Sequence, residues 1–227
     1  MKKWLAALLA ALMVVVCACA VAEDFKVTDE VAFAVTDEYN DRALIYVAIE
    51  VENVAGKPLS LGYQSSFTVM DQNGKEYSEG TFMSMYPQSI APGEKGYILP
   101  STYSLTELKS YEQVADYHYE LVGGDPSYFT CDKYETSIED HDGRILVKIF
   151  NSTGETIYNP SLVLIYRGSE GQLLHVETNY LYDYGIPAGM SAYVDMTPRK
   201  EVRDFFSDNG YTLEAAESFA YVTNYKY

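Results

Sequence analysis

The sequence predicts an all-β protein built from two tandem β-sandwiches, each with one short helix, behind an N-terminal signal peptide. Three observations predict this arrangement. The composition, with 22 Tyr, 15 Gly and 8 Pro in 227 residues, favours strands and turns over helices. Short segments alternate apolar and polar residues with period two, which is typical of strands. Turn residues recur at nearly constant spacing in the two halves, which indicates a duplicated unit.

The first 22 residues have the organisation of a secretory signal. Lys2 and Lys3 precede an apolar run over residues 4–16, and small residues follow as far as Ala22. The run is shorter than the roughly 20 apolar residues that a membrane-spanning helix needs. We expect cleavage after Ala22 and a secreted protein. The alternative is a cell-surface lipid anchor on Cys19, because residues 16–19 loosely resemble a bacterial lipobox.

The formal charge of −17 argues against nucleic acid or an anionic membrane surface as the partner, because both repel a polyanion. The acidic residues are spread along the chain, which is typical of a solubilising surface. The alternative is attraction to basic partners. Cleavage of the signal would leave Cys131 as the one cysteine, which excludes an intrachain disulfide and favours a buried, unreactive thiol.

Both halves show the same order of strands and turns. Residues 43–52 alternate like a strand with one buried face, and residues 144–150 form its counterpart. Further strands are expected over residues 66–70, 96–99 and 116–122, and again over 161–166, 192–196 and 218–225. The matched landmarks are Asn53 with Asn151, Gly74 with Gly171, and Gly93 with Gly189, at offsets of 98, 97 and 96 residues. Three landmarks at nearly one offset predict a duplicated module.

Each half also carries one helical signal after its third landmark. Ser104–Glu107 fits a capping box, which predicts a helix over residues 104–111. In the second half Thr197 and Pro198 suit a helix start, and Asn209-Gly210 suits its end. Val202, Phe205 and Phe206 would then face the core.

These elements predict one sandwich over residues 23–124 and a second over 125–227, with Gly123–Pro126 as a short connection that limits hinge motion. Short strands with regular turns in about 100 residues indicate the immunoglobulin-like type.

The second half resembles the FxLYD family of bacterial extracellular domains. The resemblance rests on residues 147–151, on 163–171 and on the turn at 186–189, although Arg167 stands where the family has an acid. The first half is similar to the telokin-like domains of bacterial lipoproteins, through residues 51–53, 70–74 and 91–94. The resemblance implies a non-enzymatic domain of the bacterial cell envelope.

Candidate catalytic and metal-binding residues are few. The chain has three His and none of the common nucleophile, zinc-protease or phosphate-loop motifs, so we expect neither catalysis nor a cofactor. Asp140 and Asp142, beside Gly143, are the best candidates for a calcium site, since calcium prefers carboxylate oxygens from a turn. The pattern favours the plainer interpretation of a hairpin turn with solvated acids.

Tyr180, Tyr182 and Tyr184 form the most suggestive local feature, because period-two spacing would place three rings on one face of a strand. A buried or half-buried row would be an aromatic ladder that stabilises the sheet. An exposed row would contact a protein or stack on sugars. We therefore expect a secreted or envelope protein that binds another extracellular or envelope protein, with a carbohydrate-binding accessory module as the alternative.

Overall fold

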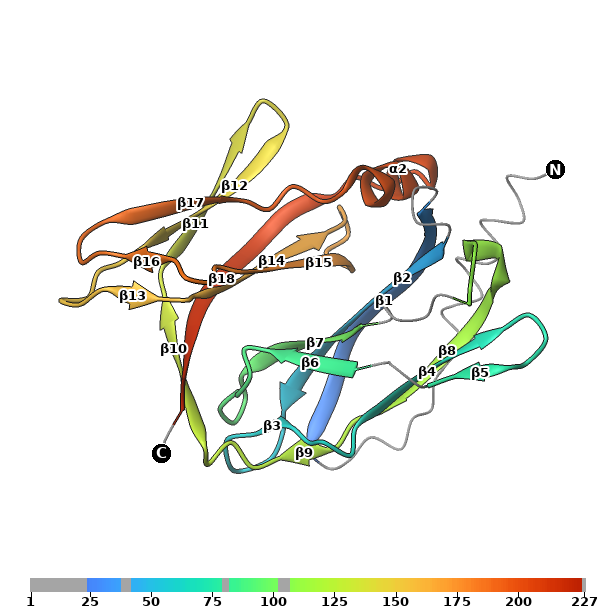
Figure 1. Ribbon diagram of the computed structural model, residues 1–227, viewed down its shortest axis with the longest axis horizontal. Coiled ribbons are helices and arrows are strands. Elements are labelled where there is room, and N and C mark those ends of the chain that lie inside the picture. Colours follow the sequence, from blue (N-terminus) through green and yellow to red (C-terminus); the bar gives the residue numbers. More distant parts are fainter. Residues whose placement is uncertain (1–23, 38–41, 79–81, 102–106, 226–227) are drawn as a thin grey trace.

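The computed structural model describes residues 24–37, 42–78, 82–101 and 107–225 (Figure 1). Within these ranges nearly all regular structure is antiparallel β-strand, which confirms the all-β prediction. The helical elements described are the α-helix α2 (Lys200–Asp208) and a single 3-10 turn, η1 (Tyr111–Gln113).

The N-terminal half, up to Gly124, builds two sheets that face each other. The first has the order β1-β2-β7-β6 and the second the order β5-β4-β8. The strands of the first sheet are β1 (Phe25–Asp37), β2 (Arg42–Asn53), β7 (Lys95–Ser101) and β6 (Phe82–Tyr86). The others are β5 (Glu76–Tyr77), β4 (Ser66–Asp71), β8 (Val114–Glu120) and the short pair β3 (Ser60–Leu61) and β9 (Gly123–Gly124).

The C-terminal half builds a second pair of sheets, of order β10-β18-β14-β15 and β11-β12-β17. The first sheet contains β10 (Phe129–Tyr134), β18 (Glu214–Tyr225), β14 (Ser161–Arg167) and β15 (Leu173–Tyr180). The second contains β11 (Thr136–His141), β12 (Arg144–Phe150) and β17 (Ser191–Asp195), and β13 (Ile157–Tyr158) pairs with β16 (Gly185–Ile186). Each half is thus a sandwich with its own apolar core. The position of a domain boundary at residue 124 stays a prediction.

The four larger sheets stack as layers (Figure 1), and the central strands β2 and β14 of the two inner sheets are buried on both faces. On β14, Leu162 and Leu164 point into the core of their own half, whereas Val163 and Ile165 pack against the N-terminal half. We call this contact between sheets β1-β2-β7-β6 and β10-β18-β14-β15, together with the packing of α2 on β1, the junction.

The prediction that residues 43–52 bury only one face is therefore wrong. In β2, Ile49 and Val51 belong to the core of the N-terminal half, while Ala48 faces the junction and Glu50 is also buried there. The alternation that suggested a solvent face comes from residues that the second half covers.

The predicted landmarks occupy equivalent places in the two halves. Asn53 is the last residue of β2 and Asn151 directly follows β12, and both are buried. Gly74 and Gly171 have φ of +78° and +83°, and Gly93 and Gly189 have φ of +76° and +72°, so all four turns need the left-handed region that glycine adopts readily.

The helix predicted in the second half is present, whereas residues 107–110 of the helix predicted in the first half are not helical. Residues 107–110 are not helical, because the backbone of Leu108 accepts a hydrogen bond from Ala43 N at 2.7 Å and its side chain enters the core. The remainder of that predicted helix, including the Ser104 cap, lies largely outside the described residues. The second helix is present as α2. Its Val202 and Phe206 are buried, but against β1 of the other half rather than in the core of their own sandwich.

The predicted signal segment, with Cys19, also lies outside the described residues. In the part of the chain that the structure describes, no helix has the length and apolar character needed to cross a membrane.

Candidate binding surfaces and the junction pocket

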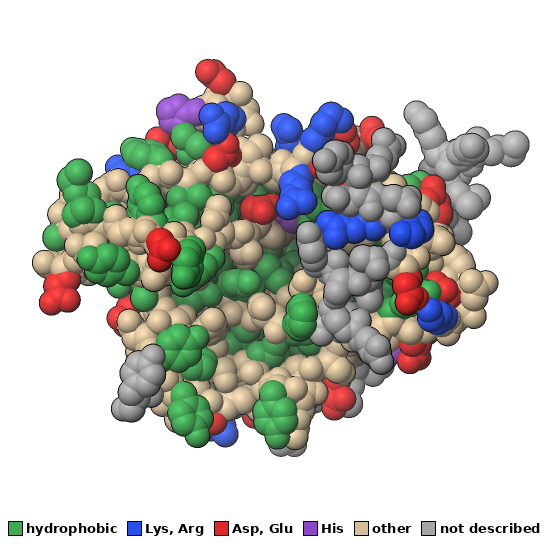
Figure 2. Space-filling view, viewed as in Figure 1, with side chains coloured by type: hydrophobic (Ala, Val, Ile, Leu, Met, Phe, Trp, Pro, Cys, Tyr) green, Lys and Arg blue, Asp and Glu red, His purple; other side chains and the backbone are tan. Residues whose placement is uncertain are grey.

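Four tyrosine rings project from one end of the C-terminal half, and we call them the tyrosine surface: Tyr158, Tyr180, Tyr182 and Tyr184. Their exposed fractions are 64%, 56%, 73% and 51%. Tyr158 on β13 pairs with Gly185, and the next residue, Asn159, donates a backbone hydrogen bond to Tyr184 O at 3.0 Å. The rings therefore come from two adjacent segments. Figure 2 shows hydrophobic side chains projecting over this half of the molecule.

The expectation of one strand carrying Tyr180, Tyr182 and Tyr184 on a single face is wrong. Strand β15 ends at Tyr180, and the chain then turns through Asp183, which has φ of +56°. The turn brings Leu181 inward against the core, so that the chain can reach β16. The alternative of a buried aromatic ladder is also wrong, because all three rings are exposed.

The geometry of the rings limits what they can contact. The centroids of Tyr180 and Tyr182 lie 6.1 Å apart, and their planes are inclined by 51°. Rings tilted in this way do not form one flat platform for a sugar ring. They do offer apolar area and hydroxyl groups to an irregular protein surface, and the exposed carboxylate of Asp183 lies between them in sequence.

Asp140 and Asp142 lie in the turn between β11 and β12. Asp140 Oδ1 accepts a hydrogen bond from Gly143 N at 3.1 Å, and Asp142 and Gly143 have φ of +53° and +83°. This is the hairpin turn that the plainer interpretation predicted. Among the described residues no group of three or more His, Cys, Asp or Glu side chains is arranged to hold a metal ion.

The histidines and Cys131 do not converge. His141 Nε2 lies 3.1 Å from Glu139 Oε2, and His175 Nε2 lies 3.0 Å from Glu177 Oε2. Cys131 is half-buried on β10, where its sulfur lies 3.9 Å from Thr223 Oγ1. Burial raises the pKa of this thiol, which makes it a poor nucleophile.

The junction contains a charged network that sequence reasoning missed. Glu50 on β2 is 1% exposed and forms ion pairs with Arg167 of β14 and, at 2.6 Å, with Lys95. Arg167 also lies 3.4 Å from Asp29, whose carboxylate accepts the backbone N–H of Leu173 at 2.7 Å. Arg167, the residue that departs from the FxLYD pattern, thus forms ion pairs across the junction.

Glu50 stays ionised in this setting. Burial favours its protonated form, but hydrogen bonds from Lys95, Thr28 and Arg167 outweigh that effect and lower the pKa of Glu50 to about 2. The neighbouring hydroxyl of Tyr97 donates to Glu50 Oε2 at 3.2 Å, and its pKa is raised by burial and by the Glu50 charge.

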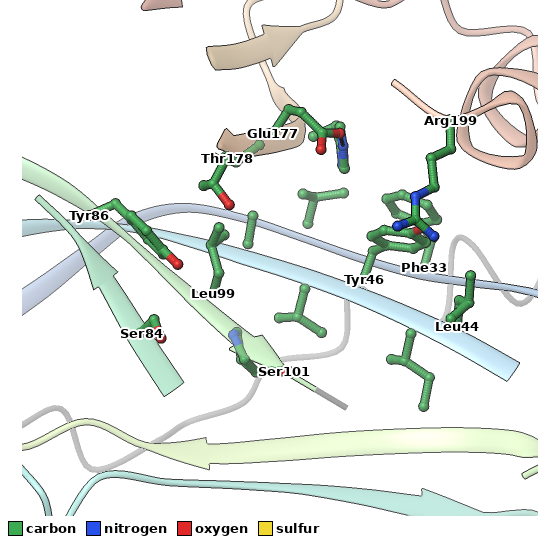
Figure 3. A pocket seen from close by; sticks show the side chains of 17 residues that line it. Phe33, Leu44, Tyr46, Ser84, Tyr86, Leu99, Ser101, Glu177, Thr178 and Arg199 are labelled. Atoms are coloured by element: carbon green, nitrogen blue, oxygen red, sulfur yellow. Dashed lines mark hydrogen bonds and ion pairs between the residues drawn. The ribbon is translucent and has the colours of Figure 1, made fainter. Parts of the chain in front are cut away.

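Beside this network the junction opens into a pocket of about 350 Å³, the junction pocket (Figure 3). Strands β1, β2, β6 and β7 of one half line it, together with β15 and the residue before α2 from the other half. Its walls are largely apolar, and include Val31, Leu44, Leu99 and Val176. The size lies within the range of small-molecule sites.

Polar side chains come from several walls of the junction pocket, and Arg199 lies near Tyr46. Phe33 and Tyr46 stack with centroids 4.9 Å apart, and Figure 3 shows Arg199 pointing toward these two rings. Burial raises the pKa of Tyr46, and the positive charge of Arg199 opposes that shift. Ser84, Tyr86 and Thr178 add hydroxyl groups elsewhere on the wall.

Comparisons with protein families, with curated proteins and with solved structures found no match for this chain. The resemblance to FxLYD and telokin-like domains therefore stays a prediction from the residues.

Proposed function

We propose that this chain is a non-catalytic binding protein of the bacterial cell envelope, which contacts an extracellular or envelope protein through the tyrosine surface. The observation that carries the proposal is the exposure of four tyrosine rings from two adjacent segments. Tyr is enriched at protein interfaces because it offers large contact area at a low cost in side-chain entropy.

The electrostatics favour a partner with basic side chains. The chain carries a formal charge of −17, and Asp183 stands among the tyrosines. A Lys or Arg of the partner would gain both ion pairing with the carboxylate and cation–π contact with the rings. His141 and His175 each lie beside a different glutamate, and Cys131 is a poor nucleophile. Both observations support a non-catalytic role.

The test compares the purified protein with the Tyr180→Ser/Tyr182→Ser/Tyr184→Ser variant in affinity capture from envelope extract. The matched control is Tyr63→Ser, since Tyr63 is 96% exposed on the other half. A protein retained by the wild type and the control, but lost with the triple variant and at high salt, would support the proposal. Retention by all three proteins would contradict it.

Carbohydrate binding by the same rings is the second candidate, because exposed tyrosines can stack on sugars. The 51° inclination of Tyr180 and Tyr182 speaks against a shared stacking platform. A glycan array decides between the two functions: sugar binding that is lost in Tyr182→Ala favours the carbohydrate module, and the absence of any sugar binding favours the protein partner.

A further inference from the structure

We propose that the junction pocket binds a small organic anion with an aromatic or branched apolar body. This proposal does not depend on the tyrosine surface, because that surface and the junction pocket share no residue. It rests on the shape of the pocket, on its apolar walls and on one basic side chain.

The apolar walls provide the affinity for the body of the ligand. A volume of about 350 Å³ accommodates a molecule with one or two rings, and the stacked rings of Phe33 and Tyr46 offer an aromatic contact. Both halves supply lining residues, so the pocket exists only while the junction is formed.

Arg199 provides the positive charge that would bind the anionic group of the ligand. Among the residues that the structure describes, no hydrogen bond or ion pair engages its guanidinium, and Figure 3 shows it directed at the aromatic rings of the pocket. Lys200, by contrast, is paired with Asp204 one helical turn further on. A planar guanidinium that is free to bind presents the fork of donors that suits a carboxylate or sulfonate.

Glu177, the one carboxylate among the described residues that line the junction pocket, does not oppose this assignment. Glu177 Oε2 lies 3.0 Å from Nε2 of the buried His175, so Glu177 already has a partner within the protein. Arg199 forms no ion pair with Glu177, so its guanidinium is available to pair with an anionic ligand.

Two probes that share a ring system test the proposal: anilinonaphthalene sulfonate, which is an anion, and phenylnaphthylamine, which lacks the sulfonate. The wild type should bind both saturably, with one site each, and each should raise the thermal unfolding midpoint. Arg199→Gln should weaken binding of the sulfonate about tenfold and leave the uncharged probe unchanged. Thr178→Phe, which adds bulk at the pocket wall, should weaken both.

Two variants provide controls. Arg203→Gln removes a charge from the next turn of α2, outside the pocket lining, and should leave both affinities unchanged. Tyr182→Ala should also leave them unchanged, which separates this site from the proposed protein contact. The proposal is overturned if neither probe binds saturably, if Arg199→Gln leaves the sulfonate affinity intact, or if Arg203→Gln lowers it equally.

Discussion

Asn53 and Asn151 make equivalent hydrogen bonds to the backbone in the two halves of the chain. The Asn53 amide donates to Lys57 O and Ile90 O at 2.9 and 3.0 Å, and the Asn151 amide donates to Glu155 O and Ile186 O at 2.7 Å each. The side-chain oxygens accept the backbone N–H two residues on, from Ala55 and Thr153, at 2.9 Å in both cases. Each asparagine thus links the end of one strand, β2 or β12, to the turn that precedes the strand paired with it, β7 or β17.

Replacing either asparagine by alanine should therefore cost similar stability. Asn53→Ala and Asn151→Ala each remove an amide that donates to two carbonyl groups, one of them on a buried isoleucine, and we expect a loss of about 3 kcal/mol in the free energy of unfolding. Asn73→Ala, in an exposed turn, should change it by less than about 0.5 kcal/mol. Urea unfolding followed by circular dichroism measures all three. A loss below 1 kcal/mol in only one of the two variants would contradict the equivalence.

The Glu50–Arg167 pair should make stability depend on pH. Glu50→Gln leaves Arg167 without its buried partner, so we expect a loss of about 3 kcal/mol at pH 7. The pKa of Glu50 falls from 4.5 to about 2 on folding, so its contribution is complete above pH 4.5 and is lost as the pH falls toward 2.

The measurement is the difference in unfolding free energy between wild type and Glu50→Gln from pH 7 to pH 2. We expect this difference to shrink below pH 4.5. The control is Glu52→Gln. In the wild type the Glu52 carboxylate lies 4.0 Å from the exposed Lys26, and its loss should change stability little. A constant difference across this pH range would show that Glu50 does not ionise as described.

Helix α2 should stabilise the junction through Phe206. This ring is 3% exposed and lies 4.9 Å, centroid to centroid, from Phe33 on β1 of the other half. Phe206→Ala should lower the free energy of unfolding by about 3 kcal/mol. Phe82→Ala, at a ring that is 64% exposed, should have little effect. Thermal unfolding of the two variants checks this, and equal midpoints would refute the role of Phe206.

Much of the layered fold follows from local patterns. The period-two segments predicted strands such as β12 and β14, and the spacing of Asn53 and Asn151 predicted equivalent turns, because strand alternation and turn chemistry are local properties. The junction could not be predicted in this way. The pairing of Glu50 with Arg167 joins residues 117 positions apart, and the sequence marked Arg167 only as a departure from the FxLYD pattern.

Three residues of the tyrosine surface, Tyr180, Tyr182 and Tyr184, could be predicted from the sequence, but their arrangement could not. Period-two spacing suggested a strand through Tyr184, whereas Asp183 adopts a positive φ and turns the chain after Tyr180. No local sequence pattern indicated the junction pocket. Its aromatic rings, its hydroxyl groups and Arg199 come from six separate segments that meet only in the folded chain.

The most direct test follows the unfolding of each half separately in one sample. It shows whether the junction makes the two halves unfold together. Fluorotyrosine resonances of Tyr119, in the N-terminal core, and Tyr166, in the C-terminal core, report on each half during urea titration. We predict that both lose their native signals at the same urea concentration. If one native resonance persists after the other has gone, the halves are independent and the junction is not the stabilising contact described above.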